Sequence, residues 1–264
     1  IEGEISKIDV THGDIHHSGT GGMLRFEYLV LALGAETNYF NIPGAREHSL
    51  PLKTFLDAVR LRDALTDLES LEGKEKRVVI AGGGSTGIEL ASEIKEWHPE
   101  LSVTVIEAAP TILPGLPDGV LRRVLRRLRK LGVAVLNGEK IVHVAQGEIS
   151  FQSGASLGHD LFVWTGGTRI PNLLATLPLK TEERGRLEVG HDMLCLTAAP
   201  DLHLYGSIYA IGDITCVYRP EGKPVQGVAR AAIVQAKSVA ENILAEILEA
   251  EGEVRNVERH FYTP

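Results

Sequence analysis

The chain has 264 residues, of which 44% are hydrophobic and 23% charged, the composition of a globular protein with one large or two modest domains. Its 27 Lys and Arg against 35 Asp and Glu give a formal net charge of -8, which argues against nucleic acid as the main partner. No apolar run approaches the ~20 residues that span a bilayer. Cys195 and Cys216 form no CxxC motif, so we expect no disulfide, no metal site and a reducing compartment.

Short strands and turns fill the first part of the chain. Alternating residues predict a small antiparallel meander over residues 4–26. The apolar run of residues 28–33 predicts a buried strand that ends at Gly34 and Ala35. Thr54 is a helix N-cap residue, and the apolar spacing after it predicts a helix that continues to about residue 71.

Residues 76–107 carry the most specific pattern in the sequence. The apolar run 77–81 predicts a buried parallel strand, and helical spacing of apolar residues begins at Ile88. A second strand, residues 102–106, ends at Glu107. The turn between the first strand and the helix matches the dinucleotide fingerprint, and it consists of Gly82, Gly83, Gly84, Ser85, Thr86 and Gly87.

Each part of this pattern has a physical role in binding a dinucleotide. Gly82 permits a tight turn, Gly84 lets the backbone approach a pyrophosphate, and Gly87 lets the helix pack close to the strand. The free N–H groups at the helix start attract the phosphate charge, and Glu107 is placed to accept hydrogen bonds from a ribose diol. The alternative is a glycine-rich turn in some other parallel-sheet protein, but the order of strand, glycines, helix, strand and acid favours a dinucleotide site.

A strongly amphipathic helix follows over residues 120–131, after a turn-rich passage. Its apolar residues share one face, and its other face carries only cations. We favour the solvated outer face of a Rossmann-type helix over a surface for anionic lipid or a protein partner. The cations are Arg122, Arg123, Arg126, Arg127, Arg129 and Lys130.

The remainder of the chain again alternates apolar runs with glycine turns. The strand predicted at residues 160–164 runs into Thr165, Gly166 and Gly167, and follows strands predicted at residues 133–135, 141–144 and 148–151. The apolar run 204–211 ends at Gly212 and Asp213. A long helix is predicted over residues 228–251, and a last strand over residues 258–262.

Four blocks of residues resemble the flavin-dependent pyridine-nucleotide oxidoreductases, and within them the type II NADH dehydrogenases. Residues 28–44 look like that family's crossover from the flavin domain into the NADH domain, and residues 81–93 look like its NADH fingerprint. Residues 163–172 are similar to the crossover back, and residues 208–213 resemble its second flavin motif. The blocks occur in family order over nearly the whole chain.

The resemblance implies an α/β fold in which a Rossmann-like dinucleotide-binding domain, residues 50–168, is inserted in a second, incomplete FAD-binding domain made of residues 1–49 and 169–264. Glu89 matches a family acid close to the nicotinamide and is the candidate catalytic residue, although a first-turn carboxylate favoured by the helix dipole gives the same pattern. The implied NADH-binding residues are Gly82, Gly83, Gly84, Ser85, Thr86, Gly87, Glu107, Thr165, Gly166 and Gly167. The implied FAD-binding residues are Gly34, Ala35, Gly212, Asp213 and Ala229.

The resemblance also implies the reaction, in which hydride passes from NADH to FAD and electrons go on to a quinone or quinone-like acceptor. The expected location is the cytoplasm, with the full-length protein held peripherally on the inner face of the cell membrane.

The sequence departs from the family pattern in three places. The family's first flavin-phosphate loop is expected upstream of Ile1, and its membrane-docking segment beyond Pro264. We therefore expect a fragment that lacks FAD, is catalytically inactive, and forms homo-oligomers through exposed edges of strands 28–33 and 204–211. At the quinone side the family has an Ala-Gln pair and a second Gln four residues later, whereas this chain has Ala229, Arg230 and Val234, with Gln235 one place along. An anionic or soluble acceptor is the competing expectation.

Two further functions stay open at this stage. A disulfide or sulfide reductase has the same fold but needs a redox cysteine pair, and Cys195 and Cys216 do not form a reactive motif. A non-catalytic NADH-sensing protein is the other alternative, because fold alone does not determine function.

Overall fold

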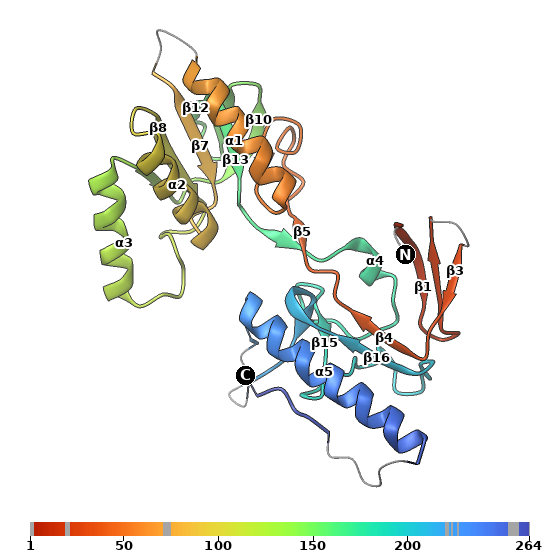
Figure 1. The fold of residues 1–264 in the computed structure, drawn as a ribbon. Coiled ribbons are helices and arrows are strands. Elements are labelled where there is room, and N and C mark those ends of the chain that lie inside the picture. Colours follow the sequence, from red (N-terminus) through yellow and green to blue (C-terminus); the bar gives the residue numbers. More distant parts are fainter. Residues whose placement is uncertain are drawn as a thin grey trace. The chain divides into compact units, whose positions relative to one another are not determined.

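The computed structural model describes residues 3–18, 22–70, 75–219, 222, 224–225, 227–252 and 259–263. The chain divides into two compact units, one formed by Ile1–Glu36 with Arg169–Pro264 and the other by Thr37–Thr168 (Figure 1). The chain passes from one unit to the other at β5 (Glu36–Thr37) and β14 (Thr168–Arg169), which pair as a two-stranded sheet.

The unit Thr37–Thr168 is built on a five-stranded parallel sheet, whose strand order is β6-β13-β7-β8-β9. The helices of this unit are α1 (Phe55–Ser70), α2 (Ser85–Trp97) and α3 (Asp118–Leu131). A separate antiparallel sheet contains β10 (Ile141–Ala145), β11 (Glu148–Phe151) and β12 (Ser156–Gly158). The strands of the parallel sheet are β6 (Leu50–Pro51), β7 (Arg77–Ala81), β8 (Ser102–Glu107), β9 (Ala134–Asn137) and β13 (Leu161–Trp164).

The apolar runs of the central strands have a direct explanation in this arrangement. Successive side chains of a strand point to opposite faces of its sheet. Val78 and Ile80 of β7 pack with buried residues of the three helices, whereas Val79 and Ala81 pack with Ile149 and other residues of the antiparallel sheet. Because both faces of the sheet are covered, every residue of β7 after Arg77 is buried. The strand therefore has a continuous apolar sequence rather than alternating apolar and polar residues.

The other unit has a core of its own around a parallel pair, β4 (Tyr28–Leu31) and β16 (Ser207–Ala210). One edge of β16 bonds β4, and its other edge bonds the segment at Met193 and Cys195. The remaining strands are β1 (Ile5–Asp9), β2 (Asp14–His17), β3 (Met23–Arg25), β15 (Leu187–Glu188) and β17 (Thr215–Cys216). The helices are α4 (Asn172–Ala175), the short 3-10 helix η1 (Gly212–Ile214) and α5 (Ala229–Ala250).

Several predicted elements agree with the structure, and Thr54 is the clearest case. Its hydroxyl accepts the Asp57 N–H at 3.2 Å, and the Asp57 carboxylate accepts the Thr54 N–H at 2.8 Å. This reciprocal pair fixes the start of α1 at Phe55, as the N-cap pattern predicts. The predicted limits of the nucleotide-binding domain, residues 50–168, differ from the compact unit at its start because residues 37–49 pack in that unit, where Ala45 is fully buried. As a division into functional domains those limits stay a prediction.

Two strand predictions were wrong in part. The run at residues 28–33 forms a strand only to Leu31, and Val30 and Leu33 are 38% and 42% exposed, so this strand is buried on one face only. The strand predicted over residues 258–262 begins at Glu258, which lies outside the described residues. Arg259 and the residues up to 263 form no strand, because the His260 and Tyr262 N–H groups donate to the Asn242 side chain and the His191 carbonyl.

Among the described residues, none of the helices combines the length and apolar character that crossing a bilayer requires.

His159 gives the unit Thr37–Thr168 a stability that depends on pH. Its ring is buried against Phe162, and neither ring nitrogen has a hydrogen-bond partner among the described residues. Burial lowers the pKa of His159 below its usual value, although the Ala145 carbonyl and the Asp160 carboxylate act in the opposite direction. The folded protein therefore holds a neutral ring that the unfolded chain protonates below about pH 6.5.

We expect His159→Leu to make the protein less sensitive to acid. The wild-type protein should lose stability as the pH falls from about 7.5 to about 5, because unfolding then takes up a proton. The variant should lose less, as measured by urea unfolding at both pH values. His143→Leu, at an exposed position of β10 in the same unit, is the matched control and should behave as wild type. An equal acid-induced loss in wild type and His159→Leu would contradict this account.

Candidate nucleotide-binding site

The glycine turn from β7 to α2 is fixed by two close backbone contacts. Gly82 has φ +107°, in the left-handed region, and a Cβ there would lie 2.7 Å from the Thr165 carbonyl oxygen. At Gly87 a Cβ would lie 2.0 Å from the Gly82 carbonyl oxygen. Any side chain at Gly87 would push α2 away from β7, so the tight turn and the close packing agree with the roles expected for these two glycines.

The start of α2 has donors but no cap. Its N-cap residue is Gly84, which has no side chain to cap the helix. The first N–H of the helix that is hydrogen-bonded is that of Ile88, which donates to the Gly84 carbonyl. Within the part of the chain that the structure describes, the N–H groups of Ser85, Thr86 and Gly87 therefore have no acceptor. The position that a Gly84 Cβ would occupy has no atom within 4 Å. Unpaired N–H groups beside open space at a helix start form an anion-binding site.

Glu107 lies beside this turn, at the carboxyl end of the neighbouring strand β8. One carboxylate oxygen accepts the Gly83 N–H at 2.7 Å, and the other accepts the Ala109 N–H at 2.7 Å. The sequence did not predict these two bonds. They fix the carboxylate beside the turn and still leave it lone pairs, because an ionised carboxylate has about four acceptor sites.

A cavity of about 380 Å³ opens at the carboxyl ends of β7, β8 and β13. Its volume lies in the range of small-molecule sites. Most of its wall is apolar, and its charged groups are Glu107, Glu139 and Lys140. The lining residues are Phe40, Ile42, Ala81, Gly82, Ile106, Glu107, Ala108, Glu139, Lys140, Ile141, Trp164 and Gly166.

Thr165, Gly166 and Gly167 come to the same place from β13. The Thr165 N–H and hydroxyl both donate to the Ala81 carbonyl, at 2.8 and 2.7 Å. Gly167 has φ +151°, and a Cβ there would lie 2.9 Å from the Phe40 ring. The structure therefore brings residues 165–167, far away in sequence, beside the Gly82 turn and Glu107.

Glu89 does not join this group. It is exposed and is not among the residues that line the cavity. The suggestion that it is a first-turn carboxylate was wrong, because α2 begins at Ser85 and its first turn contains no acid. Its role near a nicotinamide stays a prediction.

Lys140, Phe40 and Ile141 line the cavity but were not identified as site residues from the sequence. The position of Lys140 could have been predicted from the sequence. It lies three residues after the end of β9, and the residues that follow parallel strands meet at one edge of the sheet. Phe40 gave no such signal, since it lies in an irregular segment whose packing depends on Gly167.

The residues expected to bind a flavin lie in the other unit, at one edge of a sheet. Gly34 and Ala35 follow β4, and Gly212 and Asp213 follow β16. Since β4 and β16 are parallel neighbours in register, their carboxyl ends are adjacent. Ala229 is the first residue of α5, whose N-cap Val228 provides no side-chain hydrogen bond.

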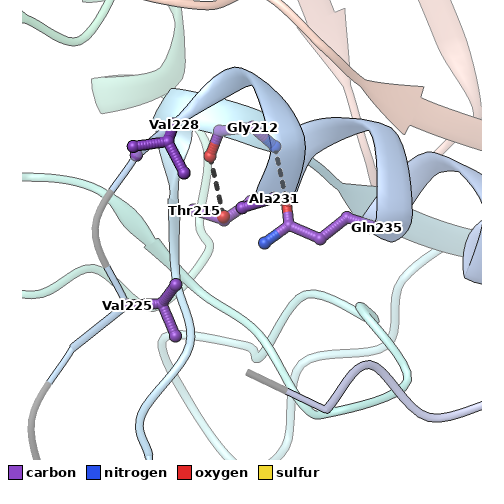
Figure 2. A pocket seen from close by; sticks show the side chains of 7 residues that line it. Gly212, Thr215, Val225, Val228, Ala231 and Gln235 are labelled. Carbon is purple, nitrogen blue, oxygen red and sulfur yellow. Dashed lines mark hydrogen bonds between the residues drawn. The ribbon is translucent and has the colours of Figure 1, made fainter.

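A buried amide closes much of the space near Gly212 (Figure 2). Gln235 is 2% exposed, and its side-chain oxygen accepts the Gly212 N–H at 2.8 Å. The Thr215 hydroxyl donates to the Gly212 carbonyl at 2.8 Å. The cavity here measures about 10 Å³, which is room for a single water molecule. Gln235, considered for the acceptor side from its position in the sequence, is thus a buried link between η1 and α5.

The two cofactor sites fit their expected groups to different degrees. The α2 turn has unpaired donors for a pyrophosphate, an acid for a diol and a cavity for the rest of a dinucleotide. At Gly212 the strand is followed by a three-residue helix, too short for a phosphate site, so the described residues there fit contacts to a polyol chain but not a pyrophosphate.

Comparisons with known proteins agree on one family for this chain. Residues 1–236 match the pyridine nucleotide-disulphide oxidoreductase family. The chain is 28% identical over 254 residues to a type II NADH:quinone oxidoreductase of Haemophilus influenzae, covering 83% of this chain and 56% of that protein. It is 27% identical over 256 residues to a demethylphylloquinone reductase of Synechocystis, covering 93% of this chain and 61% of that protein. The chain thus spans only part of the length of these relatives.

Among solved structures, a ferredoxin reductase from Rhodopseudomonas palustris superimposes with a TM-score of 0.80. The match covers 100% of this chain and 60% of the reductase, and the sequences are 23% identical, so it supports the α/β dinucleotide-binding fold alone. The resemblance to type II NADH dehydrogenases is confirmed by the relatives found. The chain belongs to the pyridine nucleotide-disulphide oxidoreductase family.

Proposed function

We propose that this chain binds NADH through residues 82–87 and Glu107, and that it forms the NADH domain and parts of the flavin domain of a flavin-dependent NADH dehydrogenase that reduces a quinone. The observation that carries the proposal is the α2 turn, where unpaired N–H groups, an oriented carboxylate and a cavity of about 380 Å³ occur together. The quinone is inferred from the names of the two relatives above.

In this proposal the α2 turn holds the pyrophosphate. The N–H groups of Ser85, Thr86 and Gly87 donate to phosphate oxygens, and the positive end of the helix dipole favours the negative charge. Glu107 accepts hydrogen bonds from the diol of the adenosine ribose. Ile106 and Ile141, which line the cavity next to Glu107, then provide apolar contact for the adenine ring.

The flavin site is the less complete part of the proposal. Gly34, Ala35, Gly212, Asp213 and Ala229 would hold the ribitol chain and the ring edge at the carboxyl ends of β4 and β16. A bound flavin supplies hydride acceptance from NADH and electron transfer to the quinone. Glu89 is proposed to lie near the nicotinamide.

Neither cysteine of this chain has the features of a redox-active thiol. Burial raises the pKa of the Cys195 thiol to about 12, so its reactive thiolate form is strongly disfavoured. Cys216 is fully buried as well. Neither thiol is suited to attack a disulfide.

Gly84→Leu tests the phosphate site without disturbing the packing. The Gly84 φ of -73° suits any residue and the space where its Cβ would point is open, so the variant should fold, with a small fall in thermal unfolding temperature because leucine is a poorer N-cap residue than glycine. The new side chain would occupy the phosphate position, and we expect NADH affinity to fall by about tenfold or more, or about 1.4 kcal/mol.

Isothermal titration calorimetry with NADH measures this effect. The matched control is Gly119→Leu, because Gly119 of α3 also has open space around its Cβ position and lies outside the cavity. The control should bind NADH as wild type does. Unchanged affinity of Gly84→Leu would rule out the α2 turn as the phosphate site.

Cofactor choice should depend on Glu107. A carboxylate there hydrogen-bonds the diol of NADH and repels the additional phosphate of NADPH, so we expect NADH to bind at least about tenfold more tightly. Glu107→Gln removes the negative charge and keeps one side-chain oxygen to accept a backbone N–H of the turn. The difference in affinity between NADH and NADPH should then narrow, because Lys140 in the same cavity attracts the additional phosphate of NADPH.

Dissociation constants for both cofactors provide the measurement. Glu93→Ala removes one negative charge from an exposed position of α2 outside the cavity, and it should leave the preference unchanged. Equal affinities of the wild-type protein for NADH and NADPH would show that Glu107 does not select the cofactor.

A further inference from the structure

The cationic and the apolar side chains of helix α3 lie on opposite faces of the helix. Because a helix turns by about 100° per residue, the six cations between Arg122 and Lys130 fall within an arc of about 160°. Leu121, Val124, Leu125, Leu128 and Leu131 lie outside this arc and pack against the core of the unit Thr37–Thr168. The helix is therefore fixed with its cations outward.

The cations of α3 are exposed and almost entirely unpaired. Only Arg127 has an acidic partner among the described residues, Glu96 of α2. No Asp or Glu occurs between Asp118 and Glu139, although the chain contains 35 acids. The outer face of α1 differs, since it mixes both signs and contains the Arg62–Asp63 pair. A solvated outer helix face does not require charges of one sign, so the face of α3 needs another explanation.

The arrangement narrows the kind of partner. With six cations and Asp118, α3 carries a formal charge of +5. Since the whole chain carries -8, the residues outside α3 carry -13. That charge would repel a long polyanion such as nucleic acid. A membrane contacts one face only, and its surface potential decays within a Debye length of about 10 Å.

Two exposed apolar side chains lie near the start of α3, Val120 in its first turn and Leu116 just before the helix. Leu116 and Val120 are 46% and 44% exposed, and they precede the cations in sequence. Apolar side chains beside a cationic helix face are the combination that binds the headgroup and acyl boundary of a bilayer.

The geometry points to the outward face of α3 as a docking surface for anionic lipid headgroups, formed by Arg122, Arg123, Arg126, Arg129 and Lys130, with the exposed Val120 and Leu116 near the start of the helix. This surface lies outside the cavity lining, so it acts independently of NADH binding.

Co-sedimentation of the 264-residue chain with vesicles tests the proposal. The chain should pellet with phosphatidylcholine vesicles that contain phosphatidylglycerol, stay in solution with phosphatidylcholine alone, and be released by salt. Arg122→Gln/Arg126→Gln/Arg129→Gln should weaken binding by about a hundredfold, because each cation near the surface contributes about fivefold. A run without vesicles separates pelleting through self-association from binding.

Two further variants make the outcome decisive. Arg60→Gln/Arg62→Gln/Lys237→Gln removes the same charge from other exposed positions and should retain binding. The α3 variant with three Arg→Lys changes should also retain it, since a lipid surface responds to charge. Circular dichroism and NADH titration confirm that each variant is folded. Absence of wild-type binding, equal loss in both Gln variants, or loss in the Lys variant would overturn the proposal, the last in favour of a specific acidic protein partner.

Discussion

The close approach of α2 to β7 at Gly87 is the constraint on which the candidate nucleotide site depends. With a Cβ position only 2.0 Å from the Gly82 carbonyl oxygen, the helix can lie where it does only if residue 87 has no side chain. Larger side chains in packed interiors typically cost about 1–3 kcal/mol and shift the backbone. A shift of α2 would move the N–H groups of Ser85 and Thr86 together, because they belong to its first turn. One backbone contact thus determines both the packing and the position of the N–H groups proposed to bind phosphate.

The rest of the site follows from the order of strands in the sheet. Because β13, β7 and β8 are parallel neighbours, residues that follow them along the chain meet at one edge. Thr165 bonds Ala81, and Glu107 bonds Gly83, so the three segments are connected by hydrogen bonds from separate parts of the sequence. The antiparallel sheet that covers the other face contributes Ile141 to the cavity wall.

Local features were predictable from the sequence because their causes are local. The Thr54 cap, the glycine turn and the continuous apolar strand β7 depend on residues a few positions apart. Features that depend on distant neighbours were not predictable. The bond from the Gly83 N–H to Glu107, the burial of His159 and the link from Gln235 to Gly212 each join segments that only the folded chain brings together. The partial exposure of β4 has the same cause, since an apolar run cannot show that one face lacks a covering layer.

The turns at Gly82 and at Gly212 differ in how their backbone polar groups are hydrogen-bonded, and this difference affects how readily each could bind a ligand. At α2 the first N–H groups have no acceptor in the described protein, so a phosphate would meet donors that are already oriented. At Gly212 the N–H is bonded by Gln235 and the carbonyl by Thr215, both from within the same unit (Figure 2). A ligand there would contact a turn whose backbone groups are already paired, and it would gain binding energy mainly from side chains and from the uncapped start of α5. The N–H groups of the candidate nucleotide site are therefore oriented without an acceptor among the described residues, whereas those of the Gly212 turn are paired by the protein itself.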